Sequence, residues 1–145
     1  DLPPMDEKQI LQRFQDRRLG FMDMLGARFV AADPVAKTCA IEFRIGQEFC
    51  HSGDIIQGGF ITAMLDSAMT HAVFAGGGGV TNLFSLEIKT NYLETARAGS
   101  LQARGSVIKS GYKLAFLEGH LYDSQGTLVA TASSVAKLLR SDVTP

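Results

Sequence analysis

The sequence predicts an α+β domain in which one buried helix packs against an antiparallel sheet of five or six strands. Two observations predict this class. Residues 58–75 are apolar on nearly every side of a helix, as expected of a helix that is covered all round. Residues 80–138 contain long strands joined by short turns, whereas parallel strands need long crossover connections. A chain of 145 residues suits one hydrophobic core.

The first 24 residues are expected to form an N-terminal helix and a connector, with residues 25–145 as a single domain. Residues 4–19 carry apolar side chains at helical spacing. Asp6 is placed as the N-cap, and Gly20 follows the expected end of the helix.

The sheet is predicted from alternating apolar and polar residues and from turn signals between them. In residues 37–45 the alternation is typical of a half-buried strand. A loop over residues 46–56 leads into the buried helix, and a run of four glycines at 76–79 is expected to be a turn that ends it. The expected strands cover residues 27–33, 37–45, 80–93, 101–109, 112–122 and 127–138.

The composition argues against several classes of protein. The 14 basic and 15 acidic residues lack the positive excess of a nucleic-acid-binding domain. The longest apolar stretch contains polar residues and ends in glycines, so we expect no membrane span. Two cysteines are too few for a disulfide framework, and no secretory signal is recognisable, so we expect a cytoplasmic protein with reduced thiols. Three scattered histidines show no metal-ligand spacing, so no metal is expected.

Asp66 is the first candidate catalytic residue because it is the only acid in the buried helix. No lysine or arginine occurs between Arg44 and Lys89, so no neighbour in the sequence can neutralise it. A buried carboxylate is retained when it is paired, hydrogen-bonded or needed for function. Asp66 is therefore expected in the active site, and the alternative is a structural hydrogen bond.

The segment Gln57-Gly58-Gly59 at the start of the same helix is a candidate oxyanion site. The first amides of a helix lack intrahelical acceptors and carry the positive end of the dipole. Glycine also lets another group approach the backbone closely. These amides could polarise a carbonyl, although two glycines before a helix are often only a tight turn.

Spacing on the helix constrains how Gly58 and Asp66 could act together. Eight residues separate them, which is about 12 Å along a helix, so one carbonyl cannot touch both. Two helices running antiparallel across a two-fold axis would bring Gly58 of one subunit near Asp66 of the other. If both residues are catalytic, we expect a dimer with shared sites.

The sequence resembles the hotdog-fold acyl-CoA thioesterases, with the phenylacetate-degradation (PaaI-like) type as the closest branch. The resemblance rests on residues 50–59 (CHSGDIIQGG) and on Leu65-Asp66-Ser67-Ala68. Asn91-Tyr92-Leu93 and the turns at 109–113 and 123–131 extend it over nearly the whole chain. It implies a sheet wrapped around a central helix, in dimers and often tetramers.

The resemblance implies a role for five residues. Asp66 would be the general base or the nucleophile, and the amide of Gly58 would hold the thioester oxygen. Ser85 would place the water or the carboxylate, although it also sits with charged residues on its strand and could be merely solvated. His51 stands where the family has Asn, and Gln57 stands where it has His. Gln57 can still donate and accept hydrogen bonds, and His51 could replace the amide or titrate, or simply face water.

The implied substrate is an acyl-CoA with an aryl or medium-length acyl group, and coenzyme A enters as part of the substrate rather than as a cofactor. Gly59 and the cations near strand ends, Arg97, Lys109 and Lys113, are the candidates for binding it. An acyl pocket could involve four apolar residues that are otherwise assigned to the core: Phe60, Met64, Met69 and Phe84.

Two other functions on the same fold stay open. One is a non-catalytic module that binds acyl-CoA or an acyl carrier, which the residues at 51 and 57 motivate. The other is dehydration of a hydroxyacyl thioester, for which His51 would be needed. Cys50 and His51 are adjacent and therefore poorly placed for a thiolate–imidazole pair. His71 and His120 are expected to be structural.

Overall fold

The structure is a computed structural model that describes residues 5–141. Its elements, in chain order, are α1 (Glu7–Asp16), α2 (Gly20–Met24), β1 (Arg28–Asp33), β2 (Thr38–Ile45), the 3₁₀ turn η1 (Gln47–Phe49), β3 (Cys50–Ser52), β4 (Ile55–Ile56), α3 (Gly58–Gly76), β5 (Val80–Tyr92), β6 (Gly99–Ser110), β7 (Leu114–Asp123) and β8 (Leu128–Arg140).

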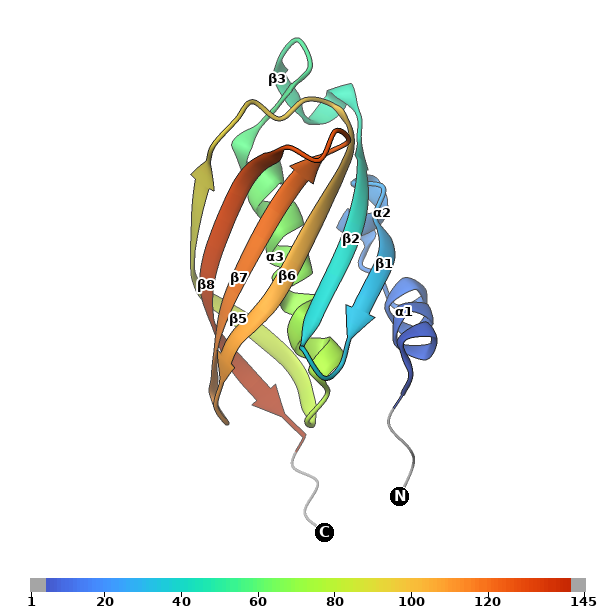
Figure 1. The fold of residues 1–145 in the computed structure, drawn as a ribbon, viewed down its shortest axis with the longest axis vertical. Helices are drawn as coiled ribbons and strands as arrows, with labels where there is room; N and C mark the ends of the chain where they lie inside the picture. Colours follow the sequence, from blue (N-terminus) through green and yellow to red (C-terminus); the bar gives the residue numbers. More distant parts are fainter. Residues whose placement is uncertain (1–4, 142–145) are drawn as a thin grey trace.

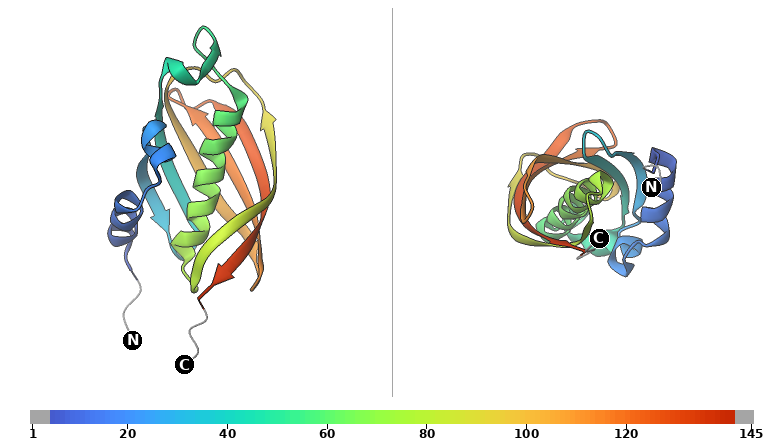
Figure 2. Two further views of the ribbon diagram at one scale, coloured as in Figure 1. Left: turned by 180° about the vertical axis from the view of Figure 1, so that it is seen from behind. Right: turned by 90° about the horizontal axis from the view of Figure 1, so that it is seen from below.

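One antiparallel sheet of six strands curls around α3, in the order β1-β2-β6-β7-β8-β5. The helix lies in the hollow of the sheet, and the view along the strands shows the sheet curving around it (Figures 1 and 2). The predicted α+β class and the hotdog fold are confirmed. The expected strands agree with the observed ones, except that the loop over residues 46–56 contains η1 and the small β3–β4 hairpin.

Two glycines on neighbouring strands let α3 sit close to the middle of the sheet. Gly105 on β6 and Gly119 on β7 are direct partners in the register. A Cβ on Gly105 would overlap the backbone carbonyl of Ala68, and one on Gly119 would lie 3.2 Å from Leu65 Cδ2. The helix therefore packs on bare backbone at this point, and its apolar residues fill the space on either side.

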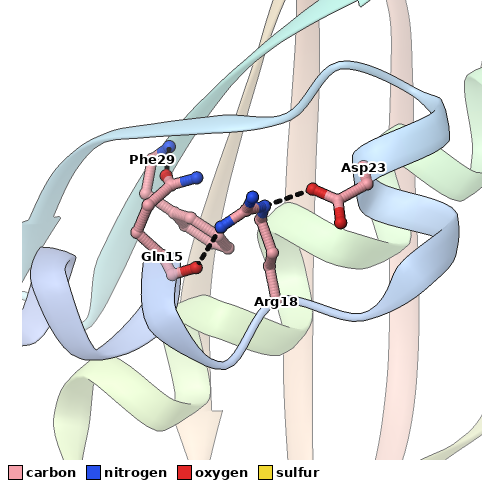
Figure 3. A network of polar contacts seen from close by, with 4 residues as sticks. All are labelled: Gln15, Arg18, Asp23 and Phe29. Atoms are coloured by element: carbon pink, nitrogen blue, oxygen red, sulfur yellow. Dashed lines mark hydrogen bonds and ion pairs between the residues drawn. The ribbon is translucent and has the colours of Figure 1, made fainter.

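The N-terminal helix is shorter than expected and a second helix follows it. α1 has the predicted N-cap Asp6, whose side chain accepts from the Gln9 amide at 2.9 Å, but it ends at Asp16. Gly20 does not close α1; it begins α2. Arg18 bridges the break, because its guanidinium binds both the Gln15 carbonyl of α1 and the Asp23 carboxylate of α2 (Figure 3). Pro4, in the expected helix, lies outside the described residues.

The two edges of the sheet differ in what covers them. α1 lies along β1, where Gln15 accepts from the Phe29 amide at 3.2 Å (Figure 3). Glu7 accepts from the Ala32 amide at 3.3 Å. β5 is paired with β8 on one side only. Among residues 5–141, β5 is therefore the sheet edge that no other element covers. The division into residues 1–24 and 25–145 stays a prediction.

The glycine run ends α3 as a turn, as predicted. Gly77, Gly78 and Gly79 all have positive φ, between 66° and 76°, which favours glycine. Arg140 holds this turn by binding the Gly78 carbonyl together with the Tyr112 and Gly111 carbonyls of the β6–β7 turn. The C-terminal end of α3 and the β6–β7 turn therefore lie at the same end of the molecule.

Candidate active site

The first turn of α3 leaves one amide without an acceptor. Gln57 is the N-cap, and its side-chain oxygen accepts from the Gly59 amide at 2.7 Å. The Phe60 amide donates to the Gln57 carbonyl at 3.0 Å. Among residues 5–141 the Gly58 amide has no acceptor. It is the free donor at the positive end of a long buried helix, which is the property required of an oxyanion site.

A neighbouring side chain in the protein itself lies close to Gly58. A Cβ at this position would lie 3.1 Å from both Cζ and Oη of Tyr92, at the end of β5. The Tyr92 hydroxyl also donates to the Gly58 carbonyl at 2.9 Å. The group that comes close to the Gly58 backbone is therefore the ring of Tyr92.

Asp66 lies in the middle of α3, partly buried. Ser85 Oγ donates to its Oδ1 at 3.1 Å, and Thr70 gives a second side-chain hydrogen bond. Burial raises the pKa of Asp66 above its ordinary value of 3.8, against the smaller opposing effect of these two hydrogen bonds. Among the described residues no cation forms an ion pair with it. A carboxylate with a raised pKa and no counter-ion is suited to accept a proton.

Ser85 faces α3 because β5 contains a bulge. The register shifts between Ser85 and Glu87, so Ser85 lies opposite the buried Ala136, while Glu87 lies opposite Val135. The expectation that Ser85 shares a face with Glu87 and Lys89 is wrong, since strict alternation fails across a bulge. Ser85 instead meets Asp66.

A groove of about 640 Å³ opens at the N-terminal end of α3. Gly58, Gly59, Gln57, His51 and Tyr92 are among its lining residues. Neither Asp66 nor Ser85 lines it, since Asp66 is two turns further along the same helix. Within one protomer, Gly58 and Asp66 therefore lie in two separate places along α3.

His51 lies on β3 at the rim of this groove. It is exposed, and its Nδ1 is 2.8 Å from Ser52 Oγ. Gln57 does not face Asp66, because its side chain caps the helix. His51 and Gln57 thus both line the groove near Gly58, although only Gln57 contacts the glycine pair.

The three cations predicted to bind coenzyme A do not lie together: Arg97 is at one end of the molecule, and Lys109 and Lys113 are at the other. Arg97 forms an ion pair with Asp54, at 2.6 Å, near the groove. Lys109 and Lys113 flank the β6–β7 turn, where the Leu138 amide donates to the Lys113 carbonyl. That turn lies beside the start of β5, whereas Gly58 contacts Tyr92 at the end of β5. Within one protomer the two lysines are remote from Gly58.

The expected acyl-pocket residues do not form one pocket. Met64 and Met69 have no exposed surface and belong to the core. Phe84 is half-exposed, but its register partner is Lys137 on the outer face of the sheet, away from α3. Phe60 alone is near the site, where its ring packs against Phe49 with centroids 4.9 Å apart. Full burial of both methionines follows from the close packing of α3 on the sheet.

The remaining histidines and the two cysteines lie away from Gly58 and Asp66 or have no catalytic partner among the described residues. His71 lies among three phenylalanine rings, its Nδ1 is 2.8 Å from the Ser67 carbonyl oxygen, and burial lowers its pKa. His120 lies 3.4 Å from Glu118 on the outer face. Burial raises the pKa of Cys39 to about 12, and Cys50 is a free, partly buried thiol.

Two further statements concern residues 5–141 alone. No group of three or more histidine, cysteine, aspartate or glutamate side chains in this range is arranged to hold a metal ion. None of the helices in this range is long and apolar enough to cross a membrane.

Three hydroxyl residues at the site were assigned no role from the sequence. Thr62 and Thr70 are on α3 at four-residue spacing from Asp66, and Tyr92 is at the end of β5. The spacing Gly58, Thr62, Asp66, Thr70 places all four on one face of the helix, and this signal is readable in the sequence. The bulge in β5 decides which of its hydroxyl side chains face these four residues, and the sequence does not reveal the bulge.

Comparison with known families identifies the protein's relatives. The sequence profile of the thioesterase superfamily matches residues 53–130, which include Gly58, Asp66 and Ser85. The chain belongs to the thioesterase superfamily. It is accordingly a thioester hydrolase, as its sequence predicted. Among curated proteins none matches this chain.

Solved structures of this superfamily share the fold over most of their length. A phenylacetic acid degradation-related protein of Ralstonia eutropha is 24% identical with a TM-score of 0.79, covering 88% of this chain and 98% of that one. The Escherichia coli PaaI protein, from the phenylacetic acid degradation operon, is 15% identical with a TM-score of 0.79, covering 89% and 91%. A thioesterase family protein of Silicibacter pomeroyi is 22% identical with a TM-score of 0.80, covering 91% and 96%. At these identities the structures show a shared fold, and the predicted resemblance to PaaI-like proteins is confirmed for the fold.

Proposed function

We propose that this thioester hydrolase cleaves acyl-CoA esters with small aryl or medium-length acyl groups, in a dimer whose two active sites are shared. One observation carries the proposal. A free amide at Gly58 and an ionisable, unpaired carboxylate at Asp66 lie on one continuous helix, about 12 Å apart. Each is half of a thioesterase site, so a complete site takes Gly58 from one subunit and Asp66 from its partner.

The uncovered β5 edge supports the proposed dimer. A strand edge with free amides and carbonyls pairs readily with another strand, and α1 covers the opposite edge. Antiparallel pairing of two β5 edges would give a symmetric interface in which the two α3 helices run antiparallel. That geometry would bring each Gly58 toward Asp66 of the partner subunit. Further pairing into tetramers stays a prediction.

The proposed reaction follows from the chemistry of the two half-sites. The thioester carbonyl oxygen accepts a hydrogen bond from the Gly58 amide, which stabilises the negative charge that develops there. Asp66 takes a proton from a water molecule as the water oxygen bonds to the carbonyl carbon. The C–S bond then breaks, the leaving coenzyme A thiolate takes the proton from Asp66, and the free acid is released with Asp66 ionised again. The alternative is direct attack by Asp66 to form an anhydride that water hydrolyses.

The same dimer would give the remote lysines a role. The β6–β7 turn lies beside the start of β5, and in an antiparallel pair this end is adjacent to the end of the partner's β5. Lys109 and Lys113 would then be near the partner's Gly58, where they could bind the phosphates of coenzyme A. We expect Lys113→Ala to raise KM for an acyl-CoA but not for the N-acetylcysteamine thioester of the same acid, which has no phosphates.

The proposal is tested by hydrolysis of an acyl-CoA panel by the wild-type protein and by Asp66→Asn. We expect wild-type turnover and a loss of at least a hundredfold in kcat for the variant. Glu87→Gln is the matched control, because Glu87 lies on the outer face of β5 and should retain full activity. Wild-type turnover that Asp66→Asn leaves unchanged would refute the mechanism. Tight binding of acyl-CoA by the wild-type protein without turnover would instead favour a binding module, a function that the replacements His51 and Gln57 motivate.

A further inference from the structure

A row of three hydroxyls connects β5 to the first turn of α3. Tyr92 Oη donates to the Gly58 carbonyl at 2.9 Å. Thr62 Oγ lies 3.0 Å from Tyr92 Oη and 2.8 Å from Thr90 Oγ. The row ends on a backbone carbonyl of the residue whose amide is free.

The direction of these hydrogen bonds follows from the number of protons. A hydroxyl has one proton to donate, and the Gly58 carbonyl can only accept. Because Tyr92 gives its proton to Gly58, Thr62 must donate to Tyr92, and Thr90 must then donate to Thr62. All three hydroxyls point their protons toward Gly58, an arrangement in which each bond strengthens the next.

Gly58 is therefore held by Tyr92 in two ways. The hydroxyl binds its carbonyl, and the ring occupies the space on its Cα, 3.1 Å from where a Cβ would lie. The same peptide, Gly58–Gly59, is held at its other end by the Gln57 side chain, which accepts from the Gly59 amide. The Gly58 N–H lies in the preceding peptide, whose Gln57 carbonyl accepts from the Phe60 amide. Because a peptide group is planar and both planes that meet at Gly58 are held, the direction of the Gly58 N–H is fixed as well. Tyr92 is about half exposed and lines the groove beside Gly58.

We propose that Tyr92 is a positioning residue: it holds the Gly58–Gly59 peptide, and through the Gly58 Cα it keeps the neighbouring Gly58 amide pointing at the thioester oxygen. This rests on the proposed oxyanion role of Gly58. The hydroxyl acts on the transition state through Gly58, so its loss should lower kcat and leave KM little changed. Small errors in the placement of a catalytic group lower the rate by about ten- to a hundredfold.

The first test compares Tyr92→Phe with the wild-type protein in kcat, KM and thermal stability. This variant keeps the ring against Gly58 and removes the hydroxyl. We expect kcat to fall about tenfold with KM within a factor of about two, and Thr90→Val, which removes the far end of the row, to give a smaller fall in kcat. Tyr122→Phe, the same change on the outer face of the sheet, is the control and should change neither. If Tyr92 only joined α3 to β5, the melting temperature of Tyr92→Phe would fall and kcat per folded protein would not.

A second measurement is independent of activity. In protein labelled with ¹⁵N-glycine, Tyr92→Phe should shift the amide resonances of Gly58 and Gly59, whereas Tyr122→Phe should leave both in place. Unmoved glycine resonances would overturn the proposal whatever the activity. Turnover that disappears in Asp66→Asn but is unchanged in Tyr92→Phe would overturn the role of Tyr92 and leave the proposed function intact. Shifted resonances in a protein without turnover would retain the positioning of Gly58 and refute the thioesterase mechanism.

Discussion

Ser85 Oγ donates to Asp66 Oδ1 at 3.1 Å, so a serine on β5 binds the one acid of α3. The contact exists because the bulge after Ser85 turns this side chain toward the helix. It has a direct electrostatic consequence. A hydrogen bond to an ionised carboxylate stabilises the charge, and so this bond lowers the pKa of Asp66, while burial raises it more strongly.

Ser85→Ala should shift the pH dependence of hydrolysis. A general base acts when it is ionised, so activity is lost as the pH falls through the pKa of Asp66. Removal of the Ser85 hydroxyl should raise that pKa further and move the acid limb of kcat/KM to higher pH. Ser133→Ala, on the outer face of β8, is the control. An acid limb at the same pH in Ser85→Ala and wild type would show that Asp66 is not the titrating base.

Asp66→Asn should stabilise the protein at neutral pH. The pKa of Asp66 is raised on folding, so ionisation favours the unfolded state. This cost is absent below the ordinary value of 3.8 and reaches its full size above the folded pKa. We expect the variant to gain about 1 kcal/mol in the free energy of unfolding at pH 7, a typical trade of stability for function. The gain should disappear as the pH approaches 3.8, as urea titrations at several pH values can measure. Equal stability of the two proteins at pH 7 would contradict the burial cost.

Gly105→Ala should destabilise the fold strongly. The added methyl would overlap the Ala68 carbonyl, and backbone in the middle of a helix cannot move aside without displacing α3. We expect a loss of about 3 kcal/mol in the free energy of unfolding, at the upper end for overpacked cores. Gly20→Ala is the matched control, because nothing lies within 4 Å of its Cβ position and its backbone does not require glycine. Denaturant titration compares the two; a Gly105→Ala protein as stable as Gly20→Ala would refute the packing argument.

Much of the fold could be predicted because its elements are long and periodic. The apolar stretch around Asp66 and the strands that follow carry patterns that local sequence determines. The end of α1 at Asp16 was not predicted, and at this point Arg18 binds groups of both α1 and α2, a contact that helical periodicity does not reveal. The direction in which Ser85 points depends on a bulge, and the close contact at Gly58 comes from Tyr92, a residue 34 positions away. Contacts between distant residues decide these features, and a local pattern does not contain them.

The shared active site is tested most directly by complementation between two inactive variants. Gly58→Pro removes the free amide at a position whose backbone suits proline, because it is the first residue of the helix and Gln57 has φ −65° and ψ 135°, the conformation favoured before proline. The half-exposed Tyr92 ring must move by a few tenths of an ångström to admit the proline Cβ. Asp66→Asn removes the carboxylate. Each variant alone should be inactive. After the two are unfolded together and refolded as a mixture, half of the dimers should be mixed, and each mixed dimer should contain one intact site. The account predicts recovery of roughly a quarter of the wild-type activity. A mixture as inactive as its two components would show that each site lies within one subunit.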